Sequence, residues 1–240
     1  MKRIFQLTLL LTLLSCEQIP GGNKKMKSKD IPVSNDKIST ADTIVPNNTE
    51  KHQTFNETVD SLPENLKTFI PNGYSAINVS TGDANLDSVP DKILVLRKNT
   101  EETSSNYAEN KPDKRPLLLL LGQTGNTYKL ACRNDDAVYC IDCGGAFGDP
   151  FTGTTIMRGY FSIEHGISGG QHWEQVTTFK YDQAKANWFL YKDHFISYKL
   201  NNSKDENAET LVKETDKLKT VKNFGMIAFA RFDIYNSKGH

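Results

Sequence analysis

The sequence lacks the local motifs that identify the common enzyme classes. Its 240 residues contain no G-x-S-x-G, no H-E-x-x-H, no P-loop and no dinucleotide fingerprint. They also carry no net charge, because 29 basic residues balance 29 acidic ones. A nucleic-acid partner, which requires a basic face, is therefore not expected. The missing motifs favour a non-enzyme but leave the question of catalysis open.

Long hydrophobic runs are also missing, with one short exception at the N-terminus. Lys2 and Arg3 precede a mostly apolar run over residues 4–14, which is too short to span a bilayer and has the proportions of a signal peptide. The run ends in Leu-Leu-Ser-Cys, which resembles the bacterial lipobox and ends at Cys16. We therefore predict a lipoprotein signal peptide at 1–15, lipidation of Cys16 and a location in the bacterial cell envelope, outside the cytoplasm. An ordinary secretory signal with an incidental cysteine is the alternative.

Composition divides the remainder of the chain into two parts. Residues 16–60 are rich in Asn, Lys, Ser, Thr, Asp and Pro and have no sustained apolar pattern. Such a segment cannot bury enough surface to offset the entropy of ordering it, so we predict a disordered tether. Residues 61–240 contain periodic apolar residues and are long enough for a single domain with its own core.

Within this domain, short alternating runs separated by turn residues predict antiparallel strands. Five consecutive leucines at 117–121 suit a strand that is buried on both faces. Strands are expected at 74–79, 92–97, 117–121, 127–133, 137–141, 154–158, 160–165, 173–181, 188–192 and 224–235. A helix is expected at 208–219 and a short one near 62–69. The predicted fold is mainly β (a β-rich α+β domain), with an antiparallel sheet and one or two short helices.

The loop between the first two strands has the most regular chemistry in the chain. Asp83, Asn85, Asp87 and Asp91 place side-chain oxygens at positions 1, 3, 5 and 9, and Val89 at position 7 offers its backbone carbonyl. This spacing suits Ca²⁺, which takes six to eight oxygen ligands. Leucine at position 12 and the flanking strands exclude an EF-hand. We predict a structural calcium turn, with an ordinary polar turn as the alternative.

This loop resembles the calcium loops of FG-GAP-type repeats, in which Asp-x-Asn-x-Asp-x-x-x-Asp precedes an apolar strand. Those repeats form propellers from several blades, whereas this chain has one copy, so a full propeller is not expected. Together with Phe69–Tyr74, Arg115–Gln123 and Gly145–Phe151, the loop is similar to a group of uncharacterised bacterial lipoproteins and exported proteins. The likeness covers most of residues 65–192 and implies a location and a fold but no activity.

Cysteines are scarce, and three of the four lie close together in the sequence. Cys140 and Cys143 form a C-x-x-C pair near Cys132. In an oxidising compartment the pair predicts a disulfide. Contact with a metal and redox chemistry are the alternatives, although a thioredoxin-like pair would open a helix and glycines follow here.

Acidic residues and histidines near two glycine-rich segments provide the candidates for catalysis. Glu164 and His165 precede the loop at 166–170, and Asp149 belongs to the glycine-rich stretch 143–153. Such groups can perform general acid–base chemistry, although solvent-facing strand residues are the simpler interpretation. We therefore expect a lipid-anchored envelope protein with a calcium-stabilised β domain that binds an envelope partner or ligand of unknown identity. An envelope hydrolase is the alternative.

Overall fold

The computed structural model describes residues 62–168, 172–203 and 207–236. The predicted signal peptide, Cys16 and the predicted tether lie outside these residues. The elements are α1 (Glu64–Lys67), β1 (Tyr74–Gly82), β2 (Asp91–Lys98), α2 (Glu101–Ser104), β3 (Leu117–Gln123), β4 (Thr127–Asn134), β5 (Phe151–Met157), β6 (Tyr160–Ile167), β7 (His172–Asp182), β8 (Asn187–Leu200), β9 (Leu211–Thr220) and α3 (Val221–Phe224). Among them, no helix has the length and apolarity needed to cross a bilayer.

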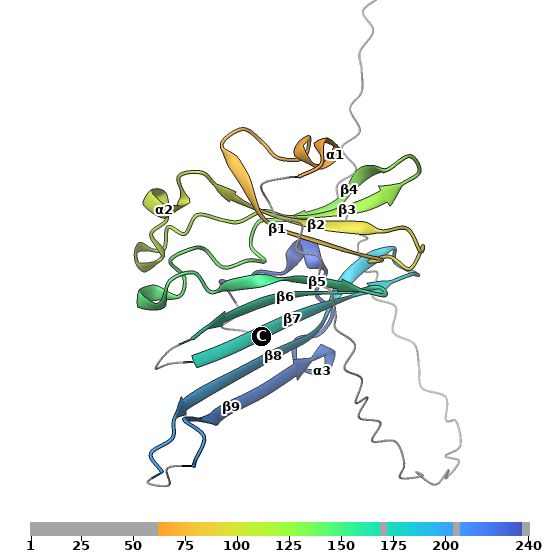
Figure 1. The fold of residues 1–240 in the computed structure, drawn as a ribbon. Coiled ribbons are helices and arrows are strands. Elements are labelled where there is room, and N and C mark those ends of the chain that lie inside the picture. Colours follow the sequence, from red (N-terminus) through yellow and green to blue (C-terminus); the bar gives the residue numbers. More distant parts are fainter. Residues whose placement is uncertain (1–61, 169–171, 204–206, 237–240) are drawn as a thin grey trace, which may run out of the picture. The chain divides into compact units, whose positions relative to one another are not determined.

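The strands form two antiparallel sheets, as Figure 1 shows. One sheet has the order β1-β2-β3-β4 and the other the order β5-β6-β7-β8-β9, so every strand pairs with its sequence neighbour within its sheet. Short turns such as those at 124–126, 158–159 and 183–186 join several of these pairs, whereas β2 and β3 are joined by the longer segment 99–116. The predicted mainly β fold is confirmed, and the described residues form two facing sheets instead of the blades of a propeller.

The leucine run is buried on both faces, as predicted. Leu117 and Leu119 of β3 face the second sheet and belong to the main core, whereas Leu118 and Leu120 face the opposite side. That opposite side is covered by Leu66 of α1 and its neighbours, which form a smaller core. An apolar residue at every position is needed because both faces of this strand exclude water.

Two edges of the sheets are joined by polar contacts and a close backbone approach. Thr154 of β5 is hydrogen-bonded through Oγ1 to Ser80 Oγ at 2.6 Å and donates to Asn78 Oδ1 at 2.6 Å, and both partners belong to β1. A Cβ atom on Gly82 would lie 2.7 Å from the Ile156 carbonyl oxygen. Only glycine therefore allows β1 to approach β5 so closely.

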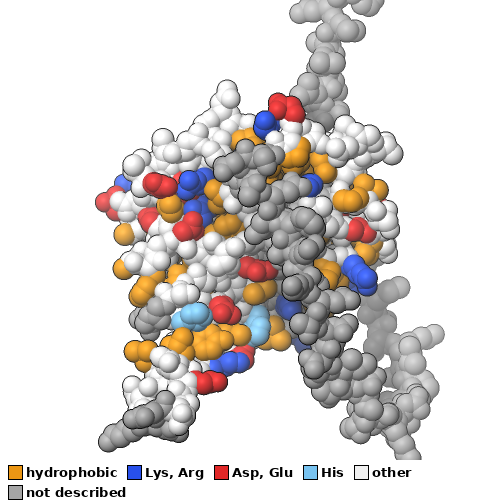
Figure 2. All heavy atoms as spheres, viewed as in Figure 1, with side chains coloured by type: hydrophobic (Ala, Val, Ile, Leu, Met, Phe, Trp, Pro, Cys, Tyr) orange, Lys and Arg blue, Asp and Glu red, His pale blue; other side chains and the backbone are white. Residues whose placement is uncertain are grey.

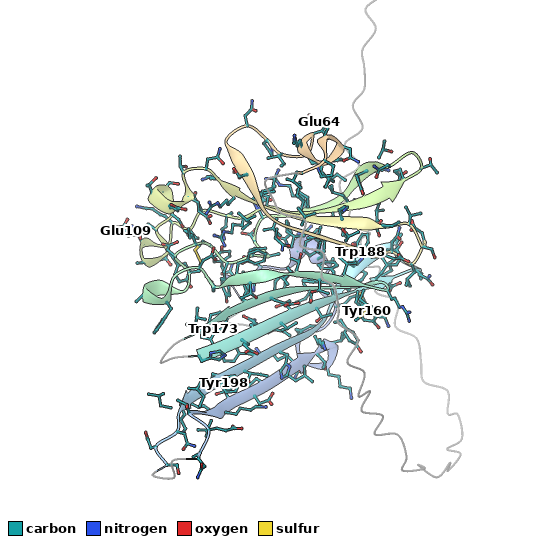
Figure 3. The ribbon with its side chains drawn as sticks, viewed as in Figure 1. Glu64, Glu109, Tyr160, Trp173, Trp188 and Tyr198 are labelled. Atoms are coloured by element: carbon teal, nitrogen blue, oxygen red, sulfur yellow. A yellow bond between two sulfur atoms is a disulfide. The ribbon has the colours of Figure 1, made fainter. Side chains whose placement is uncertain are left out.

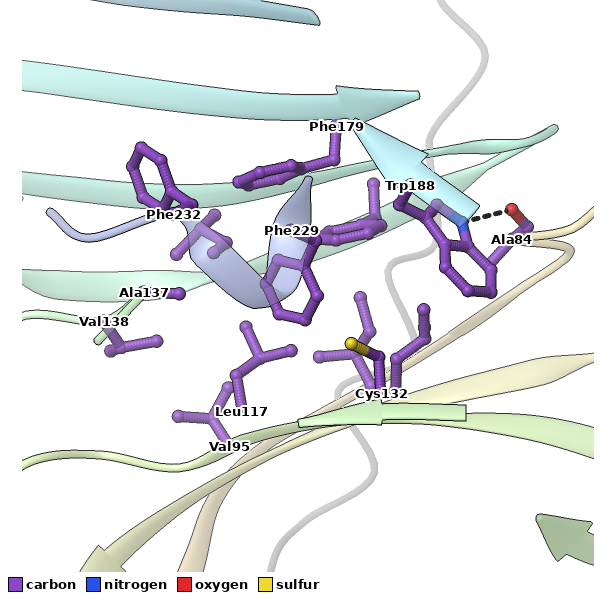
Figure 4. Close-up of a cluster of buried hydrophobic side chains, with 14 of the residues drawn as sticks. Ala84, Val95, Leu117, Cys132, Ala137, Val138, Phe179, Trp188, Phe229 and Phe232 are labelled. Carbon is purple, nitrogen blue, oxygen red and sulfur yellow. Dashed lines mark hydrogen bonds between the residues drawn. The ribbon is translucent and has the colours of Figure 1, made fainter. Parts of the chain in front are cut away.

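The C-terminal segment closes the core elsewhere, and here the predictions were wrong. Residues 224–235 do not form a strand: the segment includes a 3-10 turn at Phe229–Arg231 (η4) that inserts Phe229, Phe232 and Ile234 between the sheets. Asn134 of β4 donates from Nδ2 to the Phe229 and Phe232 carbonyls at 2.5 and 2.8 Å. Figure 4 shows Phe229 beside Phe179 and near Trp188 in this core.

Two further predictions of secondary structure were wrong. Residues 211–220 form the edge strand β9 instead of a helix, because pairing with β8 outweighs their polar, helix-compatible composition. Residues 137–141 form no strand: Ala137 and Val138 are buried in the main core, and the chain then turns toward Cys143. Both errors arise from long-range contacts that a local pattern does not report.

Truncating Phe229 should destabilise the domain strongly, because its side chain is fully buried against the rings of Phe161 and Phe179. We expect Phe229→Ala to lower the free energy of unfolding by about 3–5 kcal/mol in denaturant titrations. Met226→Ala, a control whose side chain is 65% exposed, should change it by less than about 0.5 kcal/mol. Equal effects of the two variants would contradict the described role of the C-terminal segment.

Candidate functional site

The β1–β2 loop folds around its own acidic side chains. The Asp83 carboxylate accepts the N–H groups of Leu86 at 2.6 Å and Ser88 at 3.0 Å. Asn85 Oδ1 accepts the N–H of Asp87 at 3.2 Å, and Asp87 Oδ1 accepts that of Val89 at 2.7 Å. The side chains at positions 1, 3 and 5 therefore curl the backbone into a tight loop.

Two residues in this loop have a left-handed backbone. Leu86 and Ser88 both have φ of 66°, a region that glycine occupies at little cost and other residues seldom adopt. Ser88 stands at position 6, where a sharply turning calcium loop favours glycine. The loop therefore keeps the tight turn without the residue best suited to it.

Asp91 is the buried member of the acidic set. Its Oδ2 accepts the Ala84 N–H at 2.8 Å, and its Oδ1 accepts the Gly122 N–H of β3 at 2.9 Å. Burial raises the pKa of this carboxyl, and the charges of Asp87 and Asp83 raise it further, against the two N–H groups, which lower it. The three carboxylates therefore repel one another across the loop.

The loop is also fixed to the second sheet. Trp188 of β8 donates its indole N–H to the Ala84 carbonyl at 2.7 Å, a contact drawn in Figure 4. Gly159, in the turn between β5 and β6, donates its N–H to the Asp83 carbonyl at 2.8 Å. The conformation of the acidic loop is thus coupled to the packing of the two sheets.

The loop offers the types of oxygen donor that a hard cation binds. Asp83, Asp87 and Asp91 supply carboxylates, Asn85 an amide oxygen and Val89 a carbonyl. Within the described part of the chain, no group of three or more His, Cys, Asp or Glu side chains is arranged to hold a metal ion. Asp83 and Asp87 accept backbone N–H groups instead, and each carboxylate oxygen retains a further lone pair.

The two candidates for acid–base chemistry point away from each other. Along β6 burial alternates strictly, so that His165 faces the core and Glu164 the outer side of the sheet. Glu164 Oε1 accepts hydrogen bonds from Thr155 at 3.0 Å and from Ser162 at 3.1 Å. Neighbouring residues of a strand cannot share a reacting atom in this arrangement.

His165 is held neutral inside the domain. Its side chain is 1% exposed, Nε2 accepts the Tyr139 N–H at 3.2 Å, and Nδ1 has no partner. Burial lowers the pKa of His165 to about 3, with a further contribution from the Arg115 charge. A ring in this state is not suited to act as a base near neutral pH.

The third candidate for catalysis, Asp149, belongs to a buried ion cluster around Arg115 that the sequence did not predict. Arg115 is fully buried and binds the Glu101 carboxylate, with Nε–Oε1 and Nη2–Oε2 distances of 2.6 and 3.1 Å. It also binds Asp149 through both Nη atoms, at 2.8 and 2.7 Å, and donates to the Tyr139 carbonyl at 3.1 Å. Asp149 is thus engaged in joining loops. The one signal for Arg115 in the sequence is its position, since a charged residue stands directly before Pro116 and a leucine run that is expected to be buried.

The cysteine pair lies beside this cluster. Cys140 and Cys143 are joined in a disulfide, with Cα atoms 5.1 Å apart, and Cys132 is buried in the main core. Ile141, inside the disulfide loop, donates its N–H to Glu101 Oε1 at 3.2 Å. Asp142 accepts from Ser105 Oγ at 2.5 Å and from the Tyr107 N–H at 2.6 Å. These hydrogen bonds fix the disulfide loop to the segment that carries Glu101, Ser105 and Tyr107.

The outer side of the five-stranded sheet has a groove that the sequence did not reveal. Two adjacent hollows of about 330 and 380 Å³ share Tyr191 of β8 as a wall. Met157, Tyr191 and Met226 are 58%, 42% and 65% exposed there. The chemistry of this groove depends on residues from β5 to β8 and from the C-terminal segment, which are far apart in sequence.

Burial of neutral His165 predicts a loss of stability in mild acid. The unfolded chain binds a proton below pH 6.5, whereas the native ring does so only near pH 3, so stability falls as the pH drops between these values. We expect a loss of about 2 kcal/mol between pH 6.5 and pH 5 in urea titrations. His165→Gln should remove this fall and His194→Gln, an outer-face control, should keep it. An unchanged slope in His165→Gln would contradict the assignment.

Comparison with protein-family models, with curated proteins and with solved structures finds no match for this chain. The resemblance of the Asp83–Asp91 loop to FG-GAP-type calcium loops therefore remains a prediction from the residues of the loop. Inference about function has to come from the geometry described above.

Proposed function

We propose that this protein is a lipid-anchored component of the bacterial cell envelope whose β domain binds a ligand or partner without catalysing a reaction. The observation that carries the proposal is the outer face of the five-stranded sheet, where large apolar side chains are exposed beside a groove. Exposed apolar groups gathered around a hollow are typical of binding surfaces. Figure 2 shows apolar side chains interspersed with charged ones on one face of the domain.

Calcium has a stabilising role in this proposal. Bound by Asp83, Asn85, Asp87, Asp91 and the Val89 carbonyl, Ca²⁺ would neutralise carboxylates that repel one another. The pKa of buried Asp91, raised by burial and by its acidic neighbours, supports a need for positive charge there. Because Trp188 and Gly159 attach this loop to the second sheet, the ion would strengthen the contact between the sheets.

The hydrolase alternative has less support from the geometry. Glu164 and His165 lie on opposite faces of β6, and Asp149 is bound to Arg115. A hollow of about 260 Å³ is lined by Glu164, His172 and Glu174 and by the hydroxyl-bearing residues Thr152 and Ser168. His172 Nε2 lies 3.2 Å from Glu174 Oε1, and the hydroxyls that donate to Glu164 are those of Thr155 and Ser162, so this acid is engaged within the sheet. A binding role therefore requires fewer assumptions.

Calcium should raise the melting temperature of the protein. Binding to the native state alone stabilises it by about 2.7 kcal/mol at a free concentration of 100 times Kd, or about 5–10 °C for a domain of this size. Differential scanning calorimetry with Ca²⁺ and with a chelator measures the shift. Asp87→Asn, which retains an oxygen but loses the charge, should diminish it, whereas Asp135→Asn, directly after β4 and paired with Arg133, should not. An identical midpoint with and without calcium would refute the calcium site.

Lipidation of Cys16 has a direct test in bacterial cells. An alkyne-labelled fatty acid fed to cells that express the full chain should label the protein and place it in the membrane fraction. Cys16→Ser should remove both the label and the membrane association, whereas Cys132→Ser should retain them. Unlabelled wild-type protein would contradict the predicted anchor.

A further inference from the structure

The groove on the outer face has two halves that meet at Tyr191. One half is lined by Lys180, Val221 and Met226, and the other by Met157, Tyr160 and Lys192. Figure 3 places Tyr160 at one end of the five-stranded sheet and Trp173 toward the other, so the groove lies at the end nearest the β5–β6 turn. Its length spans strands β5 to β8 and the start of the C-terminal segment.

The floor of the groove presents side chains instead of backbone groups. β6 and β7 have ladder partners on both sides, and β8 pairs with β7 along one side. On its other side at the groove, β8 contacts the C-terminal segment, where the Leu190 N–H donates to the Ile227 carbonyl at 2.8 Å and Phe189 forms a bridge with Ala228. The rings of Tyr160 and Tyr191 pack edge-to-face with centroids 5.4 Å apart. A ligand lying here therefore meets rings and aliphatic chains, with few groups that could satisfy amides of its own.

Positive charge without a counter-ion adjoins this apolar floor. Lys180 Nζ lies 5.5 and 5.7 Å from the ring centroids of Tyr160 and Tyr191, and Lys192 lines the other half of the groove. Among the described residues neither lysine has a carboxylate within ion-pair distance. Lys185, in contrast, pairs with Asp182 at 2.7 Å at the groove margin. The groove thus combines an apolar surface with two uncompensated ammonium groups.

We propose that this groove binds a single-chain anionic amphiphile, a fatty-acid-like molecule with one acyl chain and one acidic head group. The acyl chain would lie over the tyrosine rings and along Met226, and the acidic group would be bound by Lys180 and Lys192. The inference rests on the proposed binding role and specifies its ligand by charge complementarity. The amphiphile site does not depend on calcium binding or on lipidation of Cys16. If either of those predictions fails, the binding experiment below still tests the groove.

An acyl chain suits this surface better than a peptide or a bilayer does. A bound peptide would bring amide groups that the paired strands of the floor cannot satisfy, whereas an acyl chain brings none. A bilayer surface is broad, whereas the apolar surface here is recessed into hollows of about 330 and 380 Å³. These two alternatives become outcomes of the experiment.

The test uses the full chain carrying Cys16→Ser, so that no attached lipid competes for the groove. A fluorescent fatty acid is titrated below its critical micelle concentration and then displaced with dodecanoate, decanoate or dodecanol. We expect saturable binding at one site, and dodecanoate should bind on the order of tenfold more tightly than decanoate because it buries two more methylene groups. Dodecanoate should bind about five- to tenfold more tightly than dodecanol, and added salt should reduce this preference.

Variants separate the charge from the apolar surface. Lys180→Gln combined with Lys192→Gln should abolish the preference for the acid over the alcohol and leave the affinity for dodecanol within twofold. Met226→Asp should weaken both ligands by tenfold or more. The matched controls are Lys129→Gln and Leu130→Asp on exposed positions of β4, in the other sheet, and these should change neither affinity. Circular dichroism establishes that each variant is folded.

Four results would overturn the proposal. The first is no saturable binding of the monomeric fatty acid, including the case in which the protein binds only anionic vesicles, which would indicate a membrane surface. The second is equal affinity for the acid and the alcohol. The third is a preference for the acid that persists in the double lysine variant. Displacement of the probe by an acidic peptide at lower concentration than dodecanoate would also reject the amphiphile in favour of a protein partner.

Discussion

The dry contact between the inward faces of the two sheets is the constraint on which the rest of the domain depends. Neither sheet can bury its apolar face alone, and the aromatic side chains that meet between them come from β6, β7, β8 and the C-terminal segment. Because Trp188 reaches from one sheet to the backbone of the acidic loop, even that polar loop is positioned by this packing. The outer groove in turn is formed by strands whose spacing the core determines.

Local patterns predicted the hairpins well, since a strand and its partner are adjacent in sequence and share a turn. The leucine run was also informative, because only a doubly buried strand accommodates an apolar residue at every position. β9 and the C-terminal segment were mispredicted for the opposite reason. The polar run at 211–220 becomes a strand only through its partner β8. Phe229 lies in the core because its segment packs beside β4, where Asn134 Nδ2 donates to the Phe229 carbonyl.

The candidate sites differ in how much of them a sequence can disclose. The Asp83–Asp91 loop is contiguous, so its spacing is visible without a structure. Glu164 and His165 are also contiguous, but their adjacency in sequence wrongly suggested a shared catalytic site, because consecutive residues of a strand face opposite sides. The Arg115 cluster and the groove at Tyr191 combine residues from separate strands and loops, and no spacing rule brings them together.

The C-terminal segment has a consequence for the order in which the domain can be completed. Synthesis delivers a chain from its N-terminus, so the nine strands of the described residues emerge before Phe229, Phe232 and Ile234 become available. Until then the two sheets would enclose an open apolar slot, a state exposed to aggregation and to proteases. Folding to the final state must therefore wait for nearly the last described residues, which makes assistance by a chaperone most valuable at that late step.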